Sequence, residues 1–374
     1  MPAPADVSAG LARYQRQMLL QDWGEVGQRR LSRAHAMFVG VGALGCAGAD
    51  LLARAGVGTL TLIDRDIVEA TNLQRQTLFT ERDVGLPKVE AAARRLAEIN
   101  SSVQLRALAL DLTHRNAEGL LPGRDALPGV DILVDATDNF ETRYLLNDLA
   151  VKRGLPYAYA GVVGTRGMQA TFLPASARRK LATPCLRCLF DEPPAPGSAP
   201  TCDTAGVLGP AVAIVAGAQS TDVLKVLLGR EDLLAGALLE FDVWTNERRR
   251  LALGPPRGDC PCCVHARYEF LEASRTGDWG VLCGQDAVQI SPPEVRGDLG
   301  VPGASALDLD GLARRLAGVG DIARTAFMVR ARLTPDGPHS PALELSVFAD
   351  GRAIVRGTTR ADVARSIYAK YVGA

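Results

Sequence analysis

Short apolar runs alternate with amphipathic segments along the first part of the chain. Apolar runs typical of buried strands occupy residues 34–39, 59–63, 103–110 and 130–135. Apolar residues recur at helical spacing in residues 43–55, 88–99 and 141–153. Strands that alternate with helices of this length favour βαβ units. We therefore predict an α/β fold with a Rossmann-like, mostly parallel sheet.

The pattern changes after Pro156. We predict two closely spaced strands at 157–161 and 167–173, followed by a long loop at 175–206. A helix at 210–228 and a hairpin of strands 238–244 and 249–253 come next. A loop of this length is uncommon in a compact domain and is usually functional or disordered. The helix has Pro210 at its start and Gly229 at its end, as helices commonly do.

The last hundred residues have a pattern of their own. Short strand-like patches are flanked by predicted helices at about 307–317 and 360–371, and an Asp-Gly turn at 350–351 predicts a hairpin. We predict two domains: residues 1–268, and a small C-terminal α+β domain over residues 280–374.

Composition narrows the class of protein. The 374 residues are 47% hydrophobic, and 42 Lys and Arg balance 42 Asp and Glu. Zero net charge argues against a nucleic-acid or anionic-membrane partner, since such binders carry a basic excess. With no apolar run of membrane-spanning length and no signal-peptide pattern, we expect a cytoplasmic protein. Eight cysteines there point to metal or catalysis more than to disulfides.

A glycine-rich loop follows the first predicted strand and opens the first predicted helix. Its sequence GVGALG at 40–45 has the pattern G-x-G-x-x-G. Such a loop lets a phosphate approach the backbone and the N–H groups of the helix start. Asp64 ends the next strand, where a carboxylate can accept hydrogen bonds from ribose. The candidate nucleotide-binding residues of this part are Gly40, Gly42, Ala43, Gly45 and Asp64. The alternative is a tight turn that needs glycine only for packing, and the motif alone does not distinguish NAD from ATP.

Further polar residues follow along the chain, and of these Asp138 is expected on the same rim of the sheet as Asp64. Arg75 and Lys88 can neutralise phosphate charge, and Asp138, just after a strand, can hold Mg²⁺. Two cations and an acid suit a triphosphate better than a nicotinamide. Each residue taken alone could equally be a solvated surface group.

Two C-x-x-C pairs lie far apart in the chain, Cys185 with Cys188 and Cys260 with Cys263. Four thiolates from two such pairs make a closed tetrahedral Zn²⁺ site, which is structural because it has no open position. Cys262 is an extra thiol, but the spacing favours Cys263 as the ligand. The alternatives are a redox pair or unliganded thiols. Cys202, alone in the predicted loop, is either a nucleophile or a small buried residue.

Taken together, these motifs resemble those of the ThiF/MoeB family, bacterial relatives of the ubiquitin-activating enzymes. The resemblance covers roughly residues 11–268, and Ala43 departs mildly from the family's usual third glycine. The matching segments, in order, are RYQRQ at 13–17, the glycine loop, IDRD at 63–66, NLQRQ at 72–76, GLPK at 85–88, ATDN at 136–139 and the two cysteine pairs.

The resemblance implies that the chain uses Mg·ATP to adenylate the C-terminal glycine of a ubiquitin-like sulfur-carrier protein ending in Gly-Gly. The adenylate then becomes a thiocarboxylate, for thiamin or molybdopterin synthesis, with a sulfur donor such as a cysteine desulfurase. The resemblance also implies a homodimer. The roles it implies are ribose binding by Asp64, phosphate binding by Arg75 and Lys88 with Asn72 beside them, Mg²⁺ binding by Asp138, contact with the partner subunit's nucleotide by Arg16, and a covalent link to the carrier at Cys202.

Two rival functions remain open at this point. A non-catalytic scaffold would keep the fold and bind a carrier, although Arg16, Arg75, Lys88 and Asp138 are all present. An NAD-dependent dehydrogenase would use Asp64 but leaves Lys88 and the cysteine pairs unexplained. The C-terminal domain resembles the tail of longer ThiF-type proteins and lacks the cysteine loop of a rhodanese module.

Overall fold

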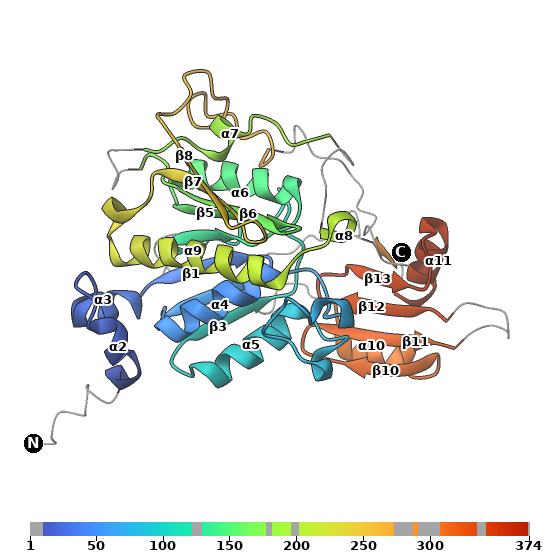
Figure 1. The fold of residues 1–374 in the computed structure, drawn as a ribbon. Coiled ribbons are helices and arrows are strands. Elements are labelled where there is room, and N and C mark those ends of the chain that lie inside the picture. The colour runs from blue at the N-terminus through green and yellow to red at the C-terminus, as the bar shows by residue number, and fades with distance from the viewer. Residues whose placement is uncertain are drawn as a thin grey trace, which may run out of the picture. The chain divides into compact units, whose positions relative to one another are not determined.

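Two compact units make up the chain, residues 1–276 and residues 277–374. The computed structural model describes residues 10–121, 129–176, 182–195, 202–272, 287–290, 307–334 and 342–372, with backbone alone for Cys202 and Asp203. Figure 1 shows the helices and strands of each unit. The two predicted domains, residues 1–268 and 280–374, stay a prediction.

The first unit is built on one eight-stranded sheet in the order β3-β2-β1-β4-β5-β6-β7-β8. The first five strands of this order run parallel, and β6, β7 and β8 follow antiparallel. The strands are β1 (His35–Val39), β2 (Thr59–Ile63), β3 (Gln104–Leu108), β4 (Ile132–Asp135), β5 (Tyr157–Val163), β6 (Arg166–Phe172), β7 (Ala237–Asp242) and β8 (Glu247–Ala252). The predicted α/β fold class is confirmed.

Helices cover both faces of this sheet, which is why its central strands are apolar on both sides. In β1, Ala36 and Phe38 belong to one core, and Met37 and Val39 belong to the other. Helices α4, α5 and α9 lie on the first face and α6 on the second (Figure 1). Their bounds are α4 (Ala43–Ala55), α5 (Lys88–Ile99), α6 (Phe140–Arg153) and α9 (Gly209–Leu228).

Helix α9 is long and apolar enough to cross a membrane by length and composition alone, with a mean hydropathy of 1.5. It nevertheless packs as a core helix against α4, β5 and β6. Val215 and Val223 on it are fully buried. Its apolar character is therefore accounted for by the core it fills.

Short helices complete the first unit. They are η1 (Ala12–Tyr14), α2 (Gln15–Met18), α3 (Gly24–Leu31), η2 (Ala70–Asn72), η3 (Glu81–Asp83), α7 (Leu186–Leu189), α8 (Cys202–Ala205) and η4 (Glu231–Leu233). Helices α7 and α8 fall within the stretch 175–206 that was predicted as loop throughout, and this part of the prediction is wrong. Around α7 the chain is packed rather than loose, since Leu186 and Arg187 are nearly inaccessible to solvent.

The second unit is a five-stranded antiparallel sheet in the order β10-β11-β12-β13-β9. Its elements are β9 (Ala287–Ile290), α10 (Leu309–Leu316), β10 (Gly320–Arg324), β11 (Met328–Leu333), β12 (Glu344–Phe348), β13 (Ala353–Arg356) and α11 (Ala361–Tyr371). Both helices pack on one apolar sheet face, with Leu312 from α10 and Ala364 from α11 in the core. The predicted α+β class is correct, and the Asp-Gly turn joins β12 to β13.

Candidate functional site

The glycine loop joins β1 to α4 and depends on glycine at two positions. Gly40 has a φ of +91°, and a Cβ there would lie 2.4 Å from the carbonyl oxygen of Ala136. A Cβ on Gly45 would lie 2.1 Å from the carbonyl oxygen of Gly40. Gly42 caps α4 without crowding, and Ala43 is the first helical residue. The loop thus packs closely against Ala136, and α4 begins directly after Gly42. A helix N-terminus at such a loop can accept a phosphate.

Asp64 is held at the end of β2 by backbone N–H groups. Its two carboxylate oxygens accept hydrogen bonds from Val41, at 2.6 Å, and from Asp66, at 2.7 Å. The first bond ties Asp64 directly to the glycine loop. Burial raises the pKa of Asp64, and the nearby Lys88 ammonium opposes that shift.

Lys88 begins α5 and points into the same cluster. Its Nζ donates to Asp66 Oδ2 at 2.9 Å, and its side chain is only 9% exposed. Burial disfavours the ammonium, but the carboxylates of Asp66 and Asp64 outweigh it and raise the pKa of Lys88 above its ordinary value. Lys88 is therefore charged at neutral pH.

Asn72 and Arg75 lie on the segment between β2 and α5. Asn72 is buried, and its Oδ1 accepts a hydrogen bond from the Glu69 N–H at 3.1 Å. Arg75 donates to the carbonyl of Thr71 at 2.8 Å. Asn72 therefore shapes this segment, while Arg75 remains partly accessible to a ligand.

Asp138 lies in the turn between β4 and α6. It is exposed and makes no hydrogen bond to any residue that the structure describes. It is close enough to Lys88 and Arg65 for its charge to act on theirs. The structure thus gathers Asp64, Lys88 and Asp138 at one rim of the sheet.

The predicted site residues leave out three charged neighbours of this group, Arg65, Asp66 and Asp111. Arg65 donates from Nη1 to both carboxylate oxygens of Asp111 at 3.3 Å, and it lies 3.9 Å from Asp66. Asp111 follows a predicted strand, just as Asp64 does, so the rule that ligands gather at the carboxyl ends of strands could have found it. Arg65 and Asp66 belong to the IDRD segment that matches the family, but the resemblance assigned them no role.

Arg16 is not brought to this rim by the structure of one chain. It is exposed on α2 and makes no hydrogen bond or ion pair with the described residues. Exposed apolar side chains lie close to it in sequence, Leu19 at 73% and Leu20 at 57%. An outward-pointing cation in this position leaves the implied role toward a partner subunit as a prediction.

Four thiols from the two C-x-x-C pairs meet in one cluster. The sulfur atoms of Cys185, Cys188, Cys260 and Cys263 all lie within 4.8 Å of one another. Cys185 Sγ is 3.7 Å from Cys260 Sγ, and Cys188 Sγ is 3.4 Å from Cys263 Sγ. A tetrahedral zinc with Zn–S bonds of about 2.3 Å requires sulfur atoms roughly 3.8 Å apart. The cluster fits that metal.

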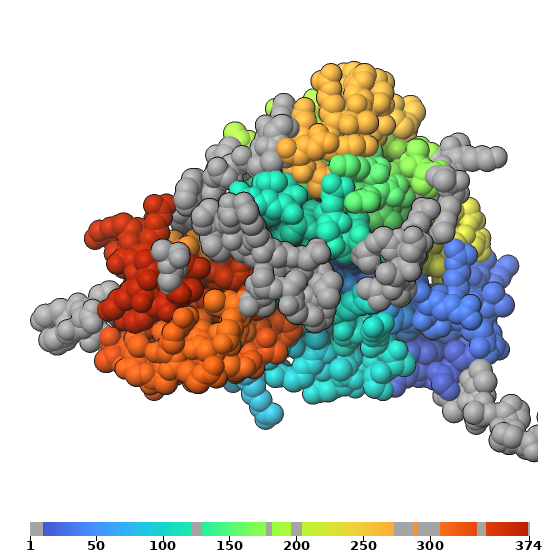
Figure 2. All heavy atoms as spheres, turned by 180° about the vertical axis from the view of Figure 1, so that it is seen from behind, coloured from blue at the N-terminus to red at the C-terminus, as the bar shows by residue number. Residues whose placement is uncertain are grey.

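The cysteine cluster is fastened to α6. Asn147 Oδ1 accepts from the Leu186 N–H at 2.9 Å, and Asn147 Nδ2 donates to the extra thiol Cys262 at 3.3 Å. Phe270 packs on Tyr144 with ring centroids 5.0 Å apart. In Figure 2 the orange segment that carries the second cysteine pair sits on this part of the first unit. Helix α6 therefore begins at the rim that carries Asp138 and holds the cysteine cluster farther along.

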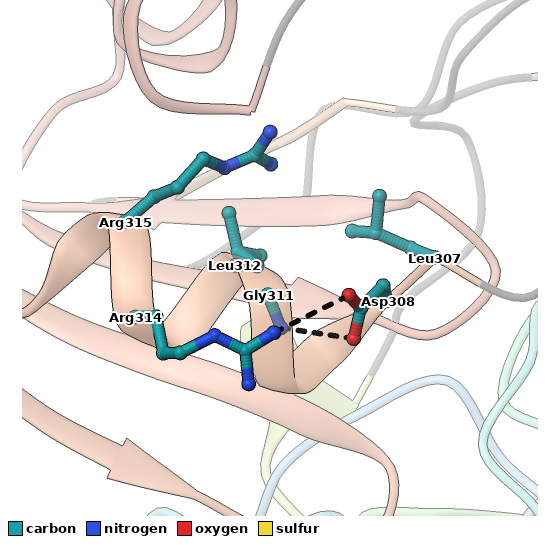
Figure 3. Close-up of a pocket in the computed structure, with 6 residues that line it drawn as sticks. All are labelled: Leu307, Asp308, Gly311, Leu312, Arg314 and Arg315. Carbon is teal, nitrogen blue, oxygen red and sulfur yellow. Dashed lines mark hydrogen bonds and ion pairs between the residues drawn. The ribbon is translucent and has the colours of Figure 1, made fainter.

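Cys202 and a hollow in the second unit are two further candidate features. Cys202 begins α8, and its side chain lies outside the described part of the structure. In the second unit, a shallow hollow at the start of α10 is lined by Leu307, Asp308 and Arg315, among others (Figure 3). Arg314 turns back toward Asp308, 3.8 Å away. No sequence-predicted site residue lines this hollow.

Comparison with known proteins finds the family whose motifs the sequence resembles. A model of the ThiF family matches residues 14–262. A Bacillus subtilis protein, sulfur carrier protein ThiS adenylyltransferase, is 42% identical over 365 residues, which cover 96% of this chain and 99% of that protein. A Thermus thermophilus protein, sulfur carrier protein adenylyltransferase, is 42% identical over 68% of this chain and 90% of its own length.

The solved structures agree with this fold. The crystal structure of Escherichia coli MccB with ATP superposes with a TM-score of 0.53 at 25% identity, over 63% of this chain and 68% of that one. Only the Bacillus protein among these three also spans the second unit, as the coverage of this chain indicates.

Proposed function

This chain belongs to the ThiF family, and from that premise we propose that it is an ATP-dependent adenylyltransferase that activates a sulfur carrier protein. The observation that carries the proposal is the likeness to the ThiS adenylyltransferase of Bacillus subtilis along nearly the whole chain. We assign a ThiS-like carrier with a C-terminal Gly-Gly as the substrate, and thiamin synthesis as the use of its thiocarboxylate.

The reaction joins the C-terminal carboxylate of the carrier to the α-phosphate of ATP and releases pyrophosphate. Such a transfer depends on positioning and on charge neutralisation, and it needs no protein nucleophile. Asp64 accepts from the ribose hydroxyls, and the start of α4 donates to the phosphates. Lys88 and Arg75 balance the charge that moves onto the leaving pyrophosphate.

Two metals belong to the proposal. Asp138 would hold Mg²⁺, which would supply positive charge to offset that of the phosphates. Its exposed carboxylate, free of hydrogen bonds to the described residues, fits that role. The four clustered thiols would hold Zn²⁺ as a structural ion that ties the segment around α7 to the end of the first unit.

The partners follow from the same proposal. We propose a homodimer in which Arg16 reaches the nucleotide of the partner subunit, and a cysteine desulfurase as sulfur donor in the cytoplasm. Cys202 is proposed to attack the acyl-adenylate, so that a thioester forms, AMP leaves and the thiol proton goes to solvent. Replacing Cys202 by Ser should then stop transfer to the protein but spare pyrophosphate exchange; undiminished thiocarboxylate formation by that variant would remove Cys202 from the mechanism.

A direct product assay tests the proposed function. The protein, Mg·ATP and a ThiS-like carrier are incubated with sulfide, which takes the place of the donor, and the carrier is weighed by mass spectrometry. Replacement of one carboxyl oxygen by sulfur is the expected result, and a carrier that lacks its last glycine is the control. An unchanged carrier together with normal ATP binding would instead favour the non-catalytic scaffold. Binding of NADH without ATP would favour the dehydrogenase.

A further inference from the structure

A buried arginine lies beneath the turn that presents Asp138. Arg143 belongs to α6, and its side chain is 9% exposed. Its Nη2 donates to the carbonyl of Thr137 at 2.8 Å and to the carbonyl of Ala160 on β5 at 3.2 Å. Its Nε donates to Asp135 Oδ2 at 3.2 Å. One side chain thus binds both the turn before Asp138 and the neighbouring strand.

The carboxylate of Asp135 fixes the same turn from its other end. One oxygen accepts from the N–H of Thr137 at 2.9 Å and from its hydroxyl at 2.6 Å. The other accepts from Arg143 and from the hydroxyl of Tyr157 at 2.6 Å. The residues on either side are also anchored, since Ala136 N donates to Val39 and Asn139 caps α6. Of the described residues 135–139, Asp138 is the exposed one.

Arg143 keeps its positive charge although it is buried. Burial disfavours it, but the Asp135 carboxylate more than compensates and raises the pKa of Arg143 above its ordinary value. The guanidinium also lies over the rings of Tyr159, at 4.9 Å, and Phe140, at 5.5 Å. A planar fork is needed to serve a carboxylate and two carbonyls at once, and the single ammonium of lysine does not reproduce it.

We propose that Arg143 is a positioning residue for the metal–nucleotide site, which holds the 135–139 turn so that the carboxylate of Asp138 faces the Mg²⁺ of Mg·ATP. The inference rests on the proposed function for the identity of the ligand. It adds a residue that touches neither nucleotide nor metal and acts on them through Asp138. Arg143 would hold in place the turn that carries the metal ligand, as neighbours that orient metal ligands commonly do.

The test separates ATP binding from its dependence on metal. Titration calorimetry of the full chain gives the affinity for ATP in EDTA and again in excess Mg²⁺. Arg143→Lys should leave the metal-free affinity unchanged and lose ~10-fold or more of the gain due to Mg²⁺, the usual effect of losing an outer partner. Asp138→Asn should lose the same gain, and combining the two changes should lose nothing further.

Two further variants control for the effect of the substitution itself and for loss of folding. Arg352→Lys makes the same substitution at another buried arginine, which pairs with Asp350 in the second unit, and it should leave both affinities unchanged. If Arg143→Lys does not fold, the neutral pair Asp135→Asn with Arg143→Gln replaces it, because that double change leaves no unpaired buried charge.

Three results would overturn the inference. One is a full Mg²⁺ gain in Arg143→Lys, and another is an equal loss of both affinities, which would show a general structural role. The third is a wild-type protein that binds ATP equally well with and without Mg²⁺. A wild-type protein that binds no ATP at all would instead overturn the proposed function, so the two failures are distinguishable.

Discussion

Single carboxylates differ sharply in how firmly the structure holds them. Both oxygens of the buried Asp135 accept hydrogen bonds from two donors each, those of the half-buried Asp64 accept from one backbone N–H each, and Asp138 makes none to the described residues. Asp135 therefore sets the shape of the site, whereas Asp64 and Asp138 keep lone pairs that a ligand can use. The sequence could predict Asp64 and Asp138, because both follow strands. It could not predict Arg143, because an arginine in a helix gives no sign that it will meet Asp135 and the carbonyl of Ala160.

Asp138→Asn tests the metal ligand itself. Because the residue is exposed, the free energy of unfolding should change by no more than about 0.5 kcal/mol. Carrier-dependent adenylation should fall by ~100-fold or more, as when one group that stabilises transition-state charge is removed. Steady-state kinetics measures the loss of adenylation, and urea denaturation measures the change in the free energy of unfolding. Near-normal turnover in a folded variant would rule out Asp138 as the Mg²⁺ ligand.

Substitutions at the adjacent residues Cys262 and Cys263 provide a test of the metal site and its control. Cys263 belongs to the four-thiol cluster, whereas Cys262 is buried against Asn147. Cys263→Ser should lose bound zinc and lower the melting temperature, because metal binding contributes to folding. Cys262→Ser should keep about one zinc per chain. Elemental analysis of the purified variants decides this, and equal zinc in both would contradict the assignment of ligands.

At the scale of elements, strong apolar patterns predicted the structure well and weak ones did not. Strands β1, β2 and β4 and helices α4 and α5 were predicted because burial imposes their periodicity. Strand β10, Gly320–Arg324, was missed because it is a largely exposed edge strand with a single large apolar residue, Ile322. Helix α7 was missed because the cysteine cluster, and not helix propensity, orders that segment. The partners of α7, Cys260 and Cys263, are distant in sequence, whereas β10 pairs with β11, the next strand along the chain.

The antiparallel strands β6 and β7 share an ion pair that titrates. Arg166 donates to Asp242 at 2.7 Å and holds the pKa of that carboxyl at about 2. The unfolded value is about 3.9, so the pair stabilises the fold above pH ~4 and loses that effect as the pH falls toward ~2.

Arg166→Gln should therefore lower stability at pH 7, and the difference from wild type should shrink below pH ~4. Urea unfolding at several pH values measures it. Arg248→Gln, at an exposed position on the neighbouring strand β8, is the control and should have little effect. A constant difference across this range would show that the pair does not act through the charge of Asp242.

At the scale of the whole molecule, each unit has its own apolar core. Among the residues that the structure describes, the cores of the first unit extend to Leu271, and the core cluster of the second starts at Val288. A chain that ends at Glu272 should therefore fold, bind zinc and bind Mg·ATP. Thermal denaturation and calorimetry test this against the full chain. Loss of the cooperative transition on truncation would show that the first unit depends on the second.

The central claim is that this chain adenylates the C-terminal glycine of a ThiS-like carrier, and ATP–pyrophosphate exchange tests it most directly. The purified protein is assayed alone and with each small Gly-Gly protein of its host. The account predicts rapid exchange with one carrier, no exchange without it, and none when its terminal glycine is removed. Absence of exchange with every such carrier, although ATP binds, would contradict the account.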